Sequence, residues 1–349
     1  MNFKKRISDY GVKTGVLPKG PRNTITDVPG VKVGHSTLSA SAVQTGVTAV
    51  LPHGGNMFAD KVLAAAHVIN GFGKSAGLIQ IDELGTLETP IVLTNTFAVG
   101  AASEALVSYM LEQNADIGRE TGTVNPVVFE CNDGFLNDIR SFSIRGEHVL
   151  EAIVSASPDF EEGAAGAGRG MSCYQLKGGI GSASRVIAFE GCSYTLGVLV
   201  LTNYGLMGQL RIEGRLVGPE IFQIAPPPDE DGSVIVIIAT DMPLTERQLG
   251  RLARRAPVGL TRTGAFISSG SGEIALAFTT ANRVKHHEPA PIVNFSVLNE
   301  NCINLVFQGV TEAVEEAVLN SMVTAEPVTG RDGNSRRSLA EFAGFFASV

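Results

Sequence analysis

The sequence predicts an α+β fold in which layered sheets are covered by helices on the outside, within one domain spanning residues 1–349. Three observations lead to this expectation. Strand-like and helix-like segments occur in groups along the chain rather than in strict alternation. Apolar residues make up 44% of the chain and its mean hydropathy is +0.17, so a large core can form. Forty glycines and the absence of tryptophan indicate tight turns and close backbone packing.

Helices are predicted from apolar spacing and from one capping signal. Residues 60–71 place Val62, Leu63 and Ala66 on one helical face. Thr245 and Gln248 form a capping box, which predicts a helix from there to about residue 255. The other predicted helices span 100–113, 147–156 and 310–323, the last with its glutamates on the outer face.

Strands are predicted where apolar and β-branched residues run between turn signals. A turn-rich opening at 24–35 precedes them, and the most glycine-rich segment spans 163–185. The predicted strands are 45–52, 90–94, 127–130, 194–202, 233–241 and 274–280.

Composition excludes several classes of partner and location. A net charge of −8 and a pI near 5.3 argue against nucleic acid or an anionic membrane as partner. The charged N-terminus lacks the apolar region of a signal peptide, and no apolar run reaches the length of about 18 residues that would indicate a membrane span. Four widely spaced cysteines are expected to be reduced and in or near the core, as in a cytoplasmic protein.

Neither a metal site nor a nucleotide site is predicted. The six histidines lack zinc spacing, and the adjacent His286 and His287 would point to opposite faces of a strand. Residues 71–75 end like a P-loop, but Val68 stands where that motif needs glycine. Residues 166–171 miss the dinucleotide fingerprint because Met171 replaces its third glycine.

The chemistry is expected at Ser233. Residues 226–231 contain three prolines and three acids, which predicts an exposed, extended loop, and a β-branched run starting at Ser233 predicts a strand buried on both faces. One interpretation is a linker with a small polar residue at the mouth of a strand. The other is self-cleavage between Gly232 and Ser233, which gives Ser233 a free amine with a pKa of about 7.7–8.0 that can act as base for its own hydroxyl.

Four blocks of sequence resemble the DmpA-type family of L-aminopeptidase/D-esterases and β-aminopeptidases. These blocks are residues 27–35, the stretch from Gly232 to Asp241, the stretch from Ser269 to Asn282, and residues 329–333. The resemblance implies a four-layer αββα sandwich like that of N-terminal-nucleophile hydrolases. It also implies self-cleavage into an α chain (1–232) and a β chain (233–349), assembly as a tetramer of αβ units, and no metal or organic cofactor.

The resemblance also assigns catalytic roles. Ser233 is the implied nucleophile, and Ser271 and Glu273 follow at the spacing that the family uses. Because they are two residues apart at the start of a strand, both can face the same side. Ser271 can relay a hydrogen bond to Ser233, and Glu273 can orient Ser271 and hold positive charge on the amine.

Further site residues are implied with the same resemblance. Asn203 is expected to donate to the oxyanion, and Lys177 to provide a cation near the nucleophile. Glu130 and Asn132 are candidates for holding the substrate's amine, with a structural role in their turn as the alternative. Phe135 stands where many relatives carry tyrosine, so a phenol donor is missing there.

The expected function is a self-processing serine aminopeptidase acting on short peptides, amides or esters with a free N-terminus. One alternative is an amidase for unnatural or cyclic-derived oligoamides. Acyl transfer to an acceptor amine on the same scaffold is another. A non-catalytic binding member is the third, favoured by the departures from the family pattern at Phe135 and Arg169.

Overall fold

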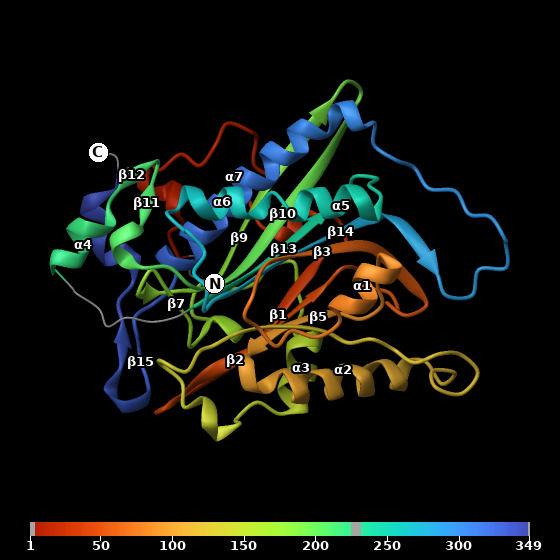
Figure 1. Cartoon of the computed structure of the whole chain (residues 1–349), viewed down its shortest axis with the longest axis horizontal. Helices are drawn as coiled ribbons and strands as arrows, with labels where there is room; N and C mark the ends of the chain where they lie inside the picture. Colours follow the sequence, from red (N-terminus) through yellow and green to blue (C-terminus); the bar gives the residue numbers. More distant parts are fainter. Residues whose placement is uncertain (1–3, 225–231, 348–349) are drawn as a thin grey trace.

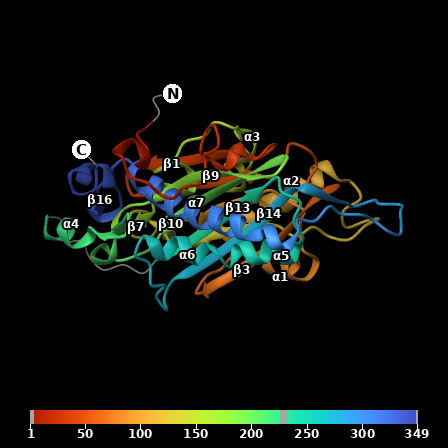
Figure 2. The same cartoon turned by 90° about the horizontal axis from the view of Figure 1, so that it is seen from above.

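The computed structural model describes residues 4–224 and 232–347, so the loop predicted at 226–231 lies outside the described part. Four layers make up the structure (Figure 1). Helices α2 (Val99–Gln113) and α3 (Gly146–Val154) cover a four-stranded sheet. That sheet packs on a six-stranded sheet, whose other face is covered by α5 (Glu246–Ala253), α6 (Ala256–Arg262) and α7 (Ile303–Val323) (Figure 2). The αββα order expected from the resemblance is therefore confirmed.

The four-stranded sheet has the order β1-β2-β5-β6. Its β5 and β6 run parallel, and its other pairs are antiparallel. Its strands are β1 (Lys32–Ala40), β2 (Val43–Leu51), β5 (Ile91–Asn95) and β6 (Val127–Cys131).

The six-stranded sheet has the order β4-β3-β14-β13-β10-β9, and only β13 and β14 run parallel. Its strands are β4 (Thr86–Leu87), β3 (Asp60–Gly71), β14 (Gly272–Lys285), β13 (Ser233–Thr240), β10 (Cys192–Asn203) and β9 (Gly179–Phe189). The remaining elements are short: α1 (Leu78–Leu84), α4 (Gly218–Ile224), β7 (Ser172–Cys173), β8 (Leu176–Lys177), β11 (Arg211–Ile212), β12 (Arg215–Leu216), β15 (Val328–Thr329) and β16 (Ser335–Arg336).

Strand β13 lies in the middle of the molecule and is buried along its whole length, as predicted. Val234 and Val236 pack into the core beneath α5–α7, whereas Ile235 and Ile237 pack into the core between the two sheets. Fully burying one such side chain stabilises a fold by about 1.5–3 kcal/mol. The strand is thus held from both sides, which fixes the position of Ser233 at its first residue.

The prediction of a helix at 60–71 is wrong. This segment is strand β3, which pairs with β14 over nearly its whole length. Its apolar spacing is compatible with either structure, and the small side chain of Ala65 leaves room for α5 to pack against the strand at Gly250. Pairing with β14 satisfies its backbone groups and decides the outcome.

The glutamates of α7 are also placed differently from the prediction. Glu312 and Glu316 are buried, and Arg185 forms ion pairs with both, at 3.0 and 2.9 Å. The N-terminal segment covers this face of the helix, where the Thr14 hydroxyl and the Lys19 ammonium donate to Glu316. A carboxylate can be buried there because cationic partners accompany it.

Three of the four cysteines are in or near the core, as predicted, and all four are free thiols. Cys131 and Cys173 are buried and Cys302 is half-buried, whereas Cys192 is exposed where β9 turns into β10.

Within residues 4–224 and 232–347, no helix has the length and apolarity needed to cross a membrane.

Candidate active site

Ser233 lies at the end of the six-stranded sheet, between two neighbouring strands. It pairs with Asn203 of β10 on one side and with Gly272 of β14 on the other. Its side chain is buried, with 6% of the residue exposed, and its Oγ accepts a hydrogen bond of 3.2 Å from the backbone N–H of Gly272. The sheet register therefore brings the predicted nucleophile beside two other chain segments.

Ser271 and Glu273 flank Gly272, so both lie next to Ser233 across the parallel pair. Ser271 Oγ donates a hydrogen bond to Glu273 Oε1, and both side chains are buried. Glu273 Oε2 is buried without a hydrogen-bond partner among the described residues. Burial raises the pKa of Glu273 to about 7, so this carboxyl group can change its charge near neutral pH.

Asn203 has a fixed side-chain orientation. Its Oδ1 accepts a hydrogen bond of 2.8 Å from the Ser172 backbone N–H, and its Nδ2 donates one of 2.9 Å to the Asn132 carbonyl. An amide nitrogen carries two hydrogens, so the second can serve a substrate oxygen. This arrangement fits the predicted role as an oxyanion donor.

Lys177 is fully buried, with an exposed fraction of 0%, and its ammonium points at the protein backbone. Its Nζ donates to the carbonyls of Gly168, Met171 and Gly178 at 2.7–2.8 Å. Burial, reinforced by the nearby positive charge of Arg169, lowers the pKa of Lys177 well below its usual range. The ammonium therefore holds the backbone just before Ser172, the residue that orients Asn203. Ser233 is not among the described contacts of Lys177.

Glu130 lies on β6, and Asn132 is the first residue after that strand. Glu130 is buried, and it accepts hydrogen bonds from the backbone N–H of Lys74 at 2.8 Å and from the hydroxyl of Thr96. Asn132 is exposed, and its Oδ1 accepts a hydrogen bond of 3.0 Å from the Gly134 backbone N–H, which is a turn-stabilising role. Both residues therefore have structural partners in addition to any substrate they contact.

Phe135 packs against an arginine. The guanidinium of Arg336 lies 3.6 Å from the ring centroid, which is a cation–π contact. Arg336 also donates to the Ser172 hydroxyl at 3.1 Å, and Ser172 in turn holds Asn203. The ring therefore supports the segment behind Asn203.

A small cavity opens next to the predicted nucleophile. Its volume is about 120 Å³, and Ser271, Glu273 and Gly232 contribute to its wall. The rest of the wall is largely apolar and is formed by Tyr204, Gly205, Leu206, Gly264, Ala265, Phe266, Ile267 and Ser268. Such a cavity combines an apolar surface with one ionisable group and suits a small acyl residue.

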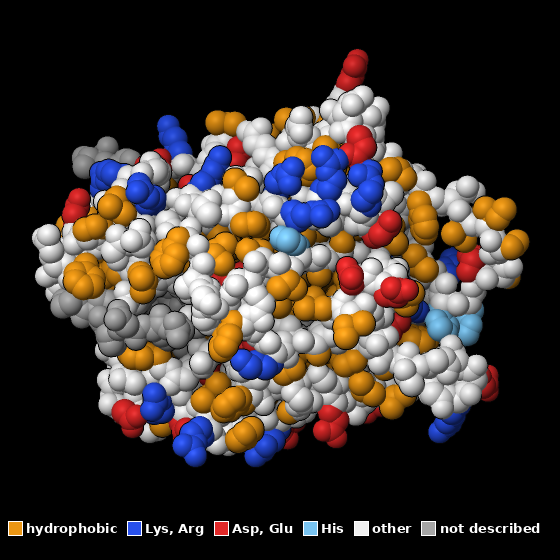
Figure 3. Space-filling view, viewed as in Figure 1, with side chains coloured by type: hydrophobic (Ala, Val, Ile, Leu, Met, Phe, Trp, Pro, Cys, Tyr) orange, Lys and Arg blue, Asp and Glu red, His pale blue; other side chains and the backbone are white. Residues whose placement is uncertain are grey.

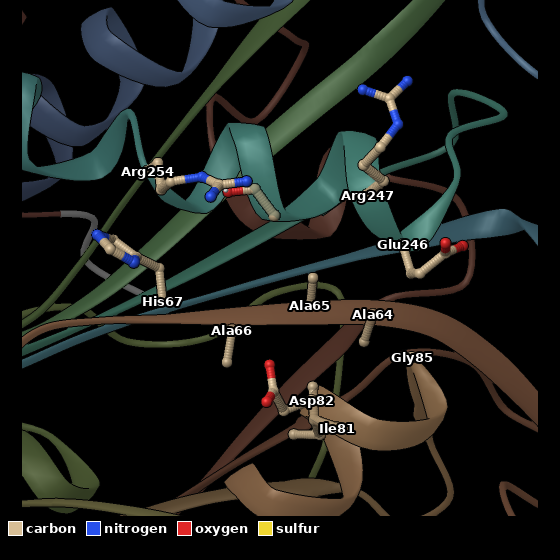
Figure 4. A pocket seen from close by; sticks show the side chains of 11 residues that line it. Ala64, Ala65, Ala66, His67, Ile81, Asp82, Gly85, Glu246, Arg247 and Arg254 are labelled. Atoms are coloured by element: carbon tan, nitrogen blue, oxygen red, sulfur yellow. Dashed lines mark hydrogen bonds between the residues drawn. The ribbon is translucent and has the colours of Figure 1, made fainter.

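A larger cavity, of about 250 Å³, lies elsewhere (Figure 4). Its floor is β3, and α1 and α5 form its sides, with His67 and Arg254 above the strand and Asp82 below it. Lysine and arginine side chains gather on the surface nearby (Figure 3). None of the predicted catalytic residues lines this cavity.

Asn70 is a site residue that the sequence analysis missed. It pairs with Glu273 across the sheet, and its Nδ2 donates to the carbonyls of Ser268 at 3.1 Å, Ser269 at 3.3 Å and Ser271. One amide thus holds the turn that carries Ser271. No sequence signal indicated this role, because the apolar spacing predicted a helix at residue 70.

Replacing Asn70 with alanine or aspartate is expected to lower kcat/KM by roughly 100-fold, because a displacement of about 1 Å at a catalytic group costs that much. Aspartate has nearly the same size as asparagine but cannot donate to the three carbonyls. If Asn70 only fills space, Asn70→Asp should retain the wild-type kcat/KM; if its amide positions the turn, Asn70→Asp should be as slow as Asn70→Ala. Asn282→Ala is the control: it removes a buried amide on the same strand pair that bonds the Ser296 carbonyl at 2.9 Å. Initial rates and thermal unfolding of all three variants give the comparison.

Comparisons with known sequences found related proteins. A sequence model described as Peptidase family S58 matches residues 23–336. The chain is 38% identical over 353 residues to the β-peptidyl aminopeptidase BapA of Sphingosinicella microcystinivorans, covering 94% of this chain and 88% of that protein.

Two solved structures resemble the fold closely. The PH0078 protein from Pyrococcus horikoshii OT3 has a TM-score of 0.94 and 51% identity over 98% of both chains. The L-aminopeptidase D-Ala-esterase/amidase from Ochrobactrum anthropi has a TM-score of 0.89 and 37% identity, covering 96% of this chain and 95% of that one. The latter is described as a prototype for the serine aminopeptidases and as a variant of the Ntn hydrolase fold.

Proposed function

The chain belongs to peptidase family S58 and is a serine-type aminopeptidase, and we propose that Ser233 becomes its nucleophile when the chain cleaves itself before this residue. The observation that carries the proposal is the meeting of Ser233, Ser271, Glu273 and Asn203 at one end of the six-stranded sheet. Three chain segments supply these side chains, and only the register of β10, β13 and β14 brings them together.

Self-cleavage needs only groups at this site and water. Ser233 Oγ attacks the Gly232 carbonyl carbon, the C–N bond breaks, and the nitrogen takes up the proton lost by the hydroxyl. Water then hydrolyses the resulting ester, which leaves a carboxylate on Gly232 and both a free hydroxyl and a free amine on Ser233. The buried carboxylate of Glu273 can stabilise positive charge on this new amine.

Turnover repeats the same attack on a substrate. The Ser233 amine accepts the hydroxyl proton while Oγ attacks the scissile carbonyl, and the ammonium then protonates the leaving amine. The second Nδ2 hydrogen of Asn203 stabilises the oxyanion. Water releases the acyl group from Ser233 and regenerates the enzyme.

We propose short peptides, amides or esters with a free amino group as substrates, with the small cavity beside Glu273 taking the acyl residue. The relative from Sphingosinicella microcystinivorans is named a β-peptidyl aminopeptidase, so amides of β-amino acids belong in the same substrate panel. A tetramer of αβ units in the cytoplasm is proposed on the family resemblance. Analytical ultracentrifugation tests the assembly.

The deciding experiment for this function is the intact mass of the purified protein under denaturing conditions. Self-cleavage predicts two chains, residues 1–232 and 233–349, whose masses sum to that of the 36.6 kDa chain plus one water. A single species that stays uncut on long incubation would exclude the N-terminal-nucleophile mechanism.

Gly232→Ala is expected to leave the chain uncut. A Cβ at residue 232 would lie 2.2 Å from the Asn203 carbonyl oxygen and 2.5 Å from the Tyr204 Cα, so the backbone must move away from the attack geometry. Gly100→Ala is the control because a Cβ there meets no atom within 4 Å. Mass spectrometry over time shows cleavage, and circular dichroism confirms folding; normal cleavage of the folded Gly232→Ala variant would contradict this prediction.

A further inference from the structure

The six-stranded sheet has an open edge along most of β3. Strand β4 pairs with β3 only at Val62 and Leu63, and the backbone N–H of Ala64 donates to the Gly85 carbonyl just before β4, at 2.8 Å. From there to the end of β3, no described residue pairs with the strand on this side. An unpaired edge presents backbone donors and acceptors to which another extended chain can bind.

The open backbone groups belong to alternate residues of β3. Along an antiparallel pair, successive residues direct their N–H and C=O groups toward and away from the partner strand. The Ala64 N–H points away from β14, so the backbone groups of Ala66 and Val68 point the same way. Neither of these two N–H groups has a hydrogen-bond partner within the described part of the chain.

The larger cavity, of about 250 Å³, lies over this edge (Figure 4). We call it the β3 slot: residues 64–67 form its floor, and α1 and α5 form its sides. Three of the four floor residues are alanines, and Gly250 lines the slot from α5 without a side chain. A Cβ at Gly250 would lie 3.6 Å from the Ala65 Cβ, so the helix stands close to the strand while no large side chain covers the edge.

Opposite charges stand at the two ends of the β3 slot. A Cβ at Gly85 would lie 2.9 Å from the Glu246 Cβ and 3.8 Å from the Ala64 carbonyl oxygen, which places Glu246 at the first end. At the other end, burial and then the positive charge of Arg254 lower the pKa of His67. Within residues 4–224 and 232–347, neither Glu246 nor Arg254 has an oppositely charged partner.

We propose that the β3 slot binds a free peptide of about three residues by β-strand addition, with its ammonium at Glu246 and its carboxylate at Arg254 and His67. Residues 64–67 span three steps of about 3.3 Å, or roughly 10 Å, which is the length of an extended tripeptide. Drug-sized ligands occupy pockets of about 300–1,000 Å³, so the β3 slot suits a ligand of this smaller size.

The open edge supplies the backbone contacts of the bound peptide. Its carbonyls can accept from the N–H groups of Ala66 and Val68, and one of its N–H groups can donate to the Ala66 carbonyl. Asp82 lies on the other side of the strand, on α1, and can accept from a further N–H (Figure 4). An internal segment of a larger protein lacks charged ends three residues apart, so the charges favour a free peptide as the occupant.

The test is calorimetric titration of the Ser233→Ala protein with trialanine, which the proposed mechanism leaves unhydrolysed in this variant. We expect saturable binding with a dissociation constant of roughly 0.1–1 mM. Adding Arg254→Ala should weaken it at least tenfold, because a paired carboxylate loses its charged donor. Arg119→Ala is the matched control, since Arg119 is exposed on another loop and has no ion pair among the described residues. Arg254 does not line the cavity beside Ser271, so binding there is the same in both variants.

Two further comparisons test the charges and the backbone contacts separately. N-acetyltrialanine amide lacks both charged ends and should bind at least tenfold more weakly than trialanine. Ala66→Pro removes an N–H that points away from β14, and it should weaken binding of trialanine about fivefold. Gly250→Leu fills the slot from α5 and tests the same surface without a change in β3.

Three results would overturn the proposal: no saturable binding of trialanine, equal affinity with and without Arg254→Ala, or equal affinity for the uncharged probe. Sedimentation velocity adds a fourth, because dissociation of an assembly by Ala66→Pro would assign the edge to a second copy of the chain. The proposed nucleophile is tested apart from the slot. Arg254→Ala with Ser233 intact is expected to cleave itself like the wild type, and hydrolysis of trialanine by Ser233→Ala would contradict the nucleophile without bearing on Arg254-dependent binding.

Discussion

Replacing Ser233 with alanine is expected to abolish both self-cleavage and aminopeptidase activity. In the proposed mechanism the hydroxyl is the attacking group in each reaction, and without cleavage no free amine forms to act as its base. Loss of a serine nucleophile lowers turnover by about 10⁴-fold or more in hydrolases of this chemistry. Initial rates with a chromogenic amide of an amino acid, measured beside intact masses, test both consequences in one preparation.

Ser269→Ala is the control for this variant. Ser269 lies in the same turn as Ser271 but is exposed, and the proposed mechanism does not use its hydroxyl. This control should cleave itself and retain wild-type rates. Cleavage after Gly232 in Ser233→Ala, or substantial amide hydrolysis by it, would show that another group is the nucleophile.

Glu273→Gln is expected to lose activity by about 100-fold or more and to flatten the rise of kcat/KM with pH. Burial raises the pKa of Glu273 to about 7, so the wild type gains the anionic form as pH rises through this value. The anion accepts the Ser271 hydroxyl hydrogen and stabilises the Ser233 ammonium. Ser271→Ala should lower the rate but keep the inflection near pH 7, because the carboxyl group is still present.

The same substitution is expected to raise stability at alkaline pH. A carboxyl group whose pKa is higher in the folded than in the unfolded protein stabilises the fold when it is protonated, and this contribution is lost as pH rises through about 7. Glutamine stays neutral at every pH. Glu273→Gln should therefore unfold at a higher temperature than the wild type above pH 7 and at a similar one below pH 5; a lower temperature throughout would mean that ionised Glu273 is stabilised in the fold.

Local sequence patterns determined much of the fold. The β-branched run predicted β13, and the capping box of Thr245 and Gln248 predicted the start of α5, which the structure confirms. The helix at 100–113 and the strand at 127–130 were also found within one or two residues. These patterns involve residues that are close together in the sequence, so they predict secondary structure without knowledge of the tertiary contacts.

The resemblance to the DmpA-type family extended this reading to residues far apart in the sequence. It correctly implied the αββα layers. It also named Asn203, Ser233 and Glu273, which the structure places on three adjacent strands, and Ser271, which directly precedes the third of them. Its placement of Lys177 near the nucleophile stays a prediction, and the structure adds that the ammonium donates to the backbone carbonyls of Gly168, Met171 and Gly178. A motif gives the residue type, but the direction of a buried ammonium depends on which carbonyls surround it.

Only the tertiary structure decided the features that depend on partners distant in the chain. Residues 60–71 became a strand because β14 supplied hydrogen bonds along it, and this pairing placed Asn70 against the turn of Ser271. Glu316 could be buried because Arg185 and Lys19 reach it from other segments. In each case the local pattern allowed two outcomes, and the free energy of long-range pairing selected one.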